Sequence, residues 1–149
     1  MNSPSGASGL TTPWHVWVVG VGALLWNCVG AFDYTMTETR NAWYMSAFTP
    51  QQLAYFYGFP KWVIATWALS VWGGVLGALA LLLCKRWAVT LFAVSLVTMT
   101  VTFFHNFVLT NGVAVAGGLA GLLFTAMIFL VGVALLGYAR VLARRGILR

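Results

Sequence analysis

Residues 60–109 have the sequence PKWVIATWALSVWGGVLGALALLLCKRWAVTLFAVSLVTMTVTFFHNFVL. They form two apolar runs, 60–84 and 87–109, that are interrupted only by Lys85 and Arg86. An α-helix rises about 1.5 Å per residue, so each run is long enough to cross about 30 Å of hydrocarbon. The basic pair between them predicts a tight helical hairpin that turns at a membrane surface.

Two further apolar runs, 14–36 and 117–138, lie on either side of this hairpin. The chain of 149 residues is 61% hydrophobic and 7% charged, with a mean hydropathy of +0.89. Soluble domains carry roughly 25% charged residues to cover their surface. We therefore predict an all-α integral membrane four-helix bundle. A single transmembrane domain would occupy 14–139, between a disordered tail at 1–13 and a basic cytoplasmic tail at 140–149. The tail lacks the basic n-region of a signal peptide, so the first run is expected to be a retained helix.

The cations are distributed unevenly between the two ends of this bundle. Cytoplasmic loops of membrane proteins are enriched in Lys and Arg, so both termini are predicted to be cytoplasmic. One side would hold Arg40 and Lys61 with both acids, Asp33 and Glu38. The other would hold six cations: Lys85, Arg86, Arg140, Arg144, Arg145 and Arg149. The net charge is +6, but the basic residues form no continuous stripe. We therefore expect no nucleic-acid partner.

The loop between the first two runs contains a helix-start signal. Thr49-Pro50-Gln51-Gln52 places Thr at an N-cap, Pro at the first helical position and Gln where it completes a capping box. Gly58 is a suitable C-cap. We expect a short helix there that lies in the outer membrane interface, because its Tyr and Phe side chains suit that depth.

Small residues recur on two of the predicted membrane helices, where they allow helix backbones to approach closely. These contacts could lie inside the bundle, which we favour, or join the chain to a second copy or a larger membrane complex. The residues are Gly73, Gly74, Gly77, Gly117, Gly118 and Gly121.

Polar residues gather near the predicted outer ends of the first and third helices. Ionisable residues in membrane helices are costly and often functional. One interpretation is a ligand-binding pocket open to the outer side. The alternative is an interfacial network in which Asp33 pairs with Arg40 and the other residues cap helix ends. The eight candidates are Asn27, Asp33, Tyr34, Glu38, Arg40, Asn41, His105 and Asn106.

Signals for a metal, cofactor or catalytic site are weak. His15 and His105 are predicted at opposite membrane surfaces, and Cys28 and Cys84 at different depths. Ser70 and Ser95 have no acid or His at a useful spacing. The sequence has no HExxH, CxxC or phosphate-binding loop. We expect no cofactor, no metal and no enzyme activity.

Several segments resemble a group of small bacterial inner-membrane proteins of about this length, which often carry the automatic label "sugar transporter". The similarity covers about residues 26–92 and implies a Gram-negative inner membrane, but it brings no site residues. It rests on DYTMT (33–37), FTPQQL (48–53), Phe59-Pro60 and VWGGVLG (71–77).

Three functions are compatible with these features. A small-solute binding or transport protein would use the outer polar pocket. An accessory subunit would pack against a larger membrane complex through the glycines. The third is a membrane enzyme or redox protein, for which the residues suggest no catalytic group or cofactor. The first is the preferred hypothesis.

Overall fold

The computed structural model describes residues 11–149, and these contain helices and no strand. Most of the predicted tail at 1–13 therefore lies outside the described residues. Four helices are long and apolar enough to cross a membrane, which confirms the four predicted runs at the level of length and composition. They are α1 (Trp14–Glu38), α4 (Lys61–Leu82), α5 (Trp87–Phe104) and α7 (Gly118–Arg144).

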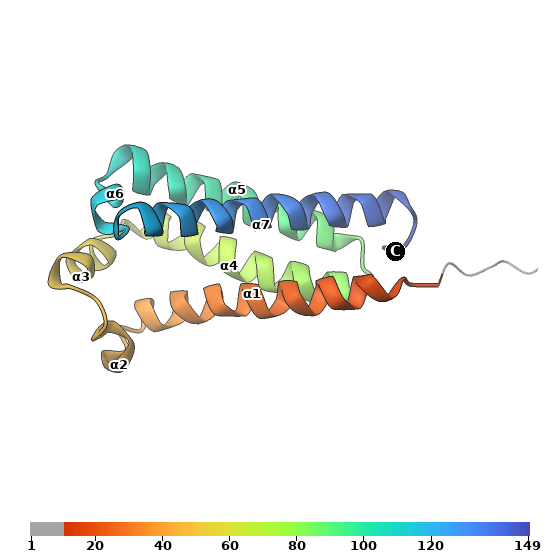
Figure 1. Ribbon diagram of the computed structural model, residues 1–149, viewed down its shortest axis with the longest axis horizontal. Helices are drawn as coiled ribbons and strands as arrows, with labels where there is room; N and C mark the ends of the chain where they lie inside the picture. The colour runs from red at the N-terminus through yellow and green to blue at the C-terminus, as the bar shows by residue number, and fades with distance from the viewer. Residues whose placement is uncertain (1–10) are drawn as a thin grey trace, which may run out of the picture.

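The four long helices lie side by side along the longest axis of the molecule (Figure 1). α1 packs on α4, α4 on α5, and α5 on α7. Figure 1 places the short elements together at one end, which we call the loop end. The opposite end holds the start of α1, the turn between α4 and α5, and the end of α7 (Figure 1), and we call it the cationic end. The short elements are α2 (Ala42–Met45), α3 (Pro50–Tyr57), a π-helical turn (His105–Leu109) that continues α5, and α6 (Gly112–Val115).

α4 and α5 form the predicted hairpin. Cys84 adopts a left-handed conformation with φ 52°. The N–H groups of Cys84 and Lys85 donate to the carbonyls of Leu81 and Ala80, which ends α4 in a Schellman motif. Below the turn, Leu81 and Phe92 are buried in the main hydrophobic cluster. Further along, the hydroxyls of Thr66 and Thr102 share a hydrogen bond of 2.9 Å.

Glycines on α4 are used for contacts inside the chain. A Cβ atom at Gly73 would contact Ser95 on α5, and one at Gly77 would collide with the ring of Phe92. A Cβ at Gly74 would collide with the side-chain oxygen of Asn27 on α1. The close approach of α1 and α5 to α4 depends on these missing side chains.

α7 begins within one residue of the prediction but ends later. Gly117 and Gly118, with φ of 82° and 73°, form the turn from α6 into α7. A Cβ atom at either position would have no neighbour within 4 Å. α7 continues to Arg144, so it includes part of the predicted basic tail at 140–149. The remaining residues turn back: Leu148 is buried, and the N–H of Arg149 donates to the carbonyl of Cys84 at 2.8 Å.

The predicted short helix in the first loop is confirmed as α3, including its capping box. The N–H of Gln52 donates to Oγ1 of Thr49, and the N–H of Thr49 donates to Oε1 of Gln52. α3 also contacts the second loop, because Nε2 of Gln52 donates to the carbonyl of Val115. The hydroxyls of Tyr55 and Thr110 share a hydrogen bond of 2.8 Å. The two loops are thus joined by side-chain hydrogen bonds.

Candidate functional site

A cavity of about 320 Å³ lies among the four long helices, and we call it the central cavity. Its wall is largely apolar, with residues such as Trp26, Met99 and Phe124. Five polar side chains interrupt this wall: Asn27, Asp33, Tyr44, Ser70 and Ser95.

Asn27 lies at the packed contact between α1 and α4. Its Nδ2 donates to the carbonyl of Ala23 at 2.8 Å, and its Oδ1 faces Gly74. Because Gly74 has no side chain, the amide of Asn27 fits between α1 and α4. A larger residue at position 74 would exclude it. Oδ1 of Asn27 accepts no hydrogen bond from residues 11–149, and Asn27 is one of the residues that line the central cavity.

Ser70 and Ser95 bring polar atoms from α4 and α5 to the same cavity. Oγ of Ser95 donates to the carbonyl of Ser70 at 2.6 Å, from one helix to the other. Sequence analysis considered these serines only as possible nucleophiles, and it did not predict this bond between the two helices. The position of the hairpin turn could have predicted this bond. Residues at similar sequence distances from Cys84 lie at similar heights on α4 and α5.

Asp33 lies on the wall of the central cavity, one helical turn or more from Asn27 toward the loop end. The hydroxyl of Tyr44 on α2 donates to its Oδ1 at 2.5 Å. Burial and the hydrogen bond and charge of Asp33 raise the pKa of Tyr44 to about 12. Tyr44 therefore remains a neutral donor at physiological pH. Sequence analysis did not include this residue among the site candidates.

α2 is the element that places Tyr44 over Asp33. Arg40, with φ 51°, ends α1 in a second Schellman motif. Oδ1 of Asn41 then accepts a hydrogen bond of 3.1 Å from the N–H of Tyr44 and caps α2. The ring of Tyr44 contacts Phe32 and Phe48, each with ring centroids 5.7 Å apart. Backbone turn, cap and aromatic packing together fix the direction of the hydroxyl.

Several predicted site residues lie elsewhere. The ring of Tyr34 packs edge to face on Trp67 of α4, with centroids 5.0 Å apart. Arg40 does not pair with Asp33; its guanidinium lies 4.4 Å from the ring centroid of Tyr57 on α3. Asn41 is a helix cap, and Glu38 ends α1 without an ion pair among residues 11–149.

His105 and Asn106 form a separate group beyond the cavity. His105 is only 6% exposed. Its Nδ1 is 3.1 Å from Oδ1 of Asn106, and its ring packs nearly perpendicular to the rings of Phe59 and Trp62. Aromatic packing thus surrounds the imidazole. The eight predicted residues do not form one pocket: Asn27 and Asp33 line the central cavity, and the other six do not.

The cavity offers hydrogen bonding in an apolar enclosure. Asp33 contributes a carboxylate, Asn27 an amide and Tyr44 a hydroxyl. Such a wall favours a small molecule that carries donor groups, either hydroxyls or an amine. In the part of the chain that the structure describes, no three His, Cys, Asp or Glu side chains lie close enough to hold a metal ion.

Comparisons of the chain with protein-family models, with curated proteins and with solved structures find no match. The arguments for function therefore rest on the geometry of the site.

Proposed function

We propose that the chain is a membrane-embedded four-helix bundle that binds a small solute in the central cavity. The bundle would lie in a bacterial inner membrane with the cationic end in the cytoplasm and the loop end in the periplasm. Four apolar helices and six cations at one end support this placement. α3, with its row of aromatic side chains, would lie at the outer interface.

One observation carries the binding proposal: Asp33 lies on the wall of an otherwise largely apolar cavity and is held by Tyr44. A carboxylate among membrane helices is costly, and such residues commonly mark ligand pathways. The volume of about 320 Å³ suits a solute at the small end of the ligand range. Asp33 and Tyr44 are nearer the loop end than Asn27, so the solute would enter from the periplasmic side.

Thermal-shift screening of the purified chain tests this proposal. The probes are a panel of small sugars, polyols and primary amines, and the readout is the melting temperature. At least one class should raise it, and Asp33→Asn and Asn27→Leu should each reduce that rise. Unchanged responses in both variants would reject binding in the central cavity.

Matched controls separate the cavity from the rest of the loop end. Tyr34→Phe removes a hydroxyl from α1 outside the cavity, and His105→Gln alters the aromatic group beyond it. Both should retain the ligand response of the wild type. If His105→Gln lost the ligand response and Asp33→Asn kept it, the binding site would lie at the π-helical turn instead.

A second candidate function is that of a subunit in a larger membrane complex. α7 packs mainly on α5 and reaches α1 only through contacts such as His15–Tyr138 and Trp26–Phe124. It exposes a row of large apolar side chains that includes Leu119, Leu123 and Leu130. Gly73, Gly74 and Gly77 already pack against α1 and α5 of the same chain. A partner would therefore contact Gly117, Gly118 and this apolar row. Purification in mild detergent followed by mass spectrometry tests this function. A monomer that binds solute without a partner would argue against it.

A further inference from the structure

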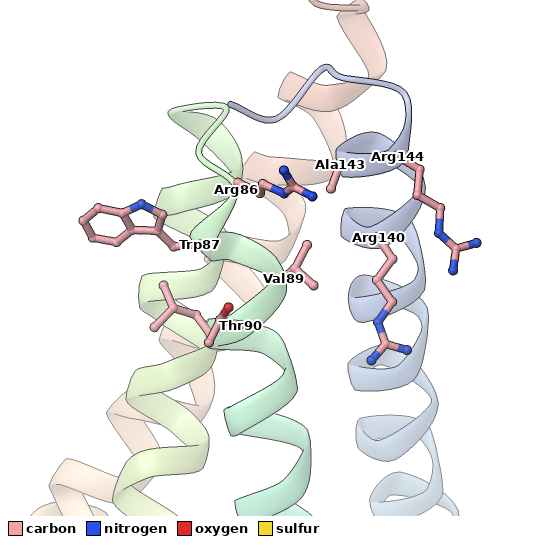
Figure 2. A pocket seen from close by; sticks show the side chains of 8 residues that line it. Arg86, Trp87, Val89, Thr90, Arg140, Ala143 and Arg144 are labelled. Atoms are coloured by element: carbon pink, nitrogen blue, oxygen red, sulfur yellow. The ribbon is translucent and has the colours of Figure 1, made fainter.

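A second hollow, of about 740 Å³, lies at the cationic end between the start of α5 and the end of α7. We call it the arginine groove. Figure 2 shows the side chain of Arg86 extending from α5 toward Ala143 on α7. Arg140 and Arg144 extend from α7, one helical turn apart, and Thr90 adds a hydroxyl from α5 (Figure 2). Arg86 and Arg140 thus line one open space from two helices, and Arg144, which also lines it, extends from the side of α7 away from α5 in this view (Figure 2).

No acidic side chain neutralises these groups. The two acids of the chain, Asp33 and Glu38, both lie toward the loop end of α1. None of the three arginines of the groove forms an ion pair within residues 11–149. Like charges on neighbouring helices repel each other, and this repulsion acts at the contact between α5 and α7. An anion in the groove would remove the repulsion and connect the two helices.

The surroundings of the groove favour a lipid as the source of that anion. Val89 and Leu91 line it beside the arginines, and apolar side chains such as Val94 and Val133 are exposed farther along α5 and α7. Trp87 and Trp14, 71% and 75% exposed, lie at the same end and suit the depth of lipid headgroups. A headgroup would therefore meet arginines while its acyl chains follow the apolar helix surfaces.

We propose that the arginine groove binds the phosphodiester of an acidic phospholipid, with Arg86 and Arg140 holding the phosphate from α5 and α7. Guanidinium groups bind phosphate with paired hydrogen bonds, and basic pockets between membrane helices on the cytoplasmic side are typical acidic-lipid sites. This inference rests on the proposed membrane insertion, but it is independent of solute binding in the central cavity. The bound lipid would stabilise the packing of α7 on α5.

Native mass spectrometry of the full chain in neutral detergent tests the proposal. Dioleoyl-phosphatidylglycerol should remain bound, whereas dioleoyl-phosphatidylcholine of the same chain length should not. Arg86→Gln or Arg140→Gln should weaken phosphatidylglycerol binding by roughly fivefold, and the double variant by roughly twentyfold. Arg145→Gln removes the same charge outside the groove and should bind like the wild type.

The melting temperature provides a second measurement. Phosphatidylglycerol should raise it in the wild type and in Arg140→Lys, which keeps the charge. Inorganic phosphate and glycerol phosphate should not raise it, because they lack acyl chains. Three outcomes would overturn the proposal: equal weakening by Arg145→Gln, equal binding of phosphatidylcholine, or equal protection by the free phosphates.

The two sites are distinguished by their own variants. Asp33→Asn should lose the solute response and keep phosphatidylglycerol, and Arg86→Gln with Arg140→Gln should do the reverse. A solute response lost in Asp33→Asn with no selective lipid binding in the wild type would reject the lipid site alone. Selective lipid binding with no solute response would reject the cavity proposal alone.

Discussion

The hydroxyl of Tyr44 donates a hydrogen bond of 2.5 Å to the carboxylate of Asp33, and this bond joins α2 to α1 at the wall of the central cavity. The bond satisfies one oxygen of a partly buried carboxylate. It also fixes the carboxylate toward the cavity. The stability and the titration of this pair can both be measured.

Tyr44→Phe removes the hydroxyl and keeps the ring contacts with Phe32 and Phe48. We expect the free energy of unfolding to fall by about 1–2 kcal/mol, since hydrogen bonds to charged groups contribute about 1.5–3 kcal/mol and this site is only half-buried. Titration with a denaturing detergent measures the change. Tyr34→Phe is the control, because the hydroxyl of Tyr34 makes no hydrogen bond within residues 11–149, and it should leave stability unchanged.

The raised pKa of Tyr44 predicts a dependence of stability on alkaline pH. In the unfolded chain its phenol loses a proton near pH 10, whereas in the folded chain it does so at about 12. The stabilisation is fully present below pH 10 and is lost as the pH rises through 12. Between these values the melting temperature should fall more steeply in the wild type than in Tyr44→Phe. Parallel curves would contradict the assigned pKa.

Gly74→Ala places a methyl group against the side-chain oxygen of Asn27. The free energy of unfolding should fall by about 1–3 kcal/mol, because the added methyl group overpacks the α1–α4 contact. Adding Asn27→Ala should recover part of the loss, and this non-additivity identifies the contact. Gly22→Ala, at a position with nothing nearby, should be neutral or slightly stabilising because alanine favours helix. Equal effects at both glycines would contradict the packing described.

Ser95→Ala removes the hydrogen bond from α5 to the carbonyl of Ser70 on α4. Bonds between membrane helices contribute about 0.6 kcal/mol on average and up to about 1.7, so a loss in this range is expected. Thr100 on the same helix donates to its own backbone at Leu96. Thr100→Ala should therefore cost less, and a larger loss there would place the important bond elsewhere.

Arg40 and Asp33 should behave as independent residues. Arg40→Gln is expected to cost about 0.5–1 kcal/mol, because its guanidinium lies over Tyr57 near the surface. In a double-mutant cycle the effects of Arg40→Gln and Asp33→Asn should add. A coupling energy above about 1 kcal/mol would instead support the Asp33–Arg40 ion pair that the sequence suggested.

Much of the fold could be predicted because its signals are local. The lengths of the apolar runs gave the long helices, Lys85 and Arg86 gave the hairpin, and the Thr49 capping box gave α3. α2, α6 and the π-helical turn were missed, because each spans four or five residues and depends on neighbours for stability. The candidate site was predicted only in part: Asn27 and Asp33 line the cavity, but helical spacing could not show which way a side chain at a helix end would point.

By itself the sequence determined four long apolar helices, a strong charge difference between their ends and the start of a capped helix. These properties follow from composition and from neighbours along the chain. The tertiary structure decided which polar atoms meet. It joined Tyr44 to Asp33, set Ser95 against Ser70, turned Arg40 to Tyr57, enclosed His105 in aromatic rings and brought Arg86 to α7. Such meetings depend on how helices rotate and approach one another, and that is set by packing at positions such as Gly74.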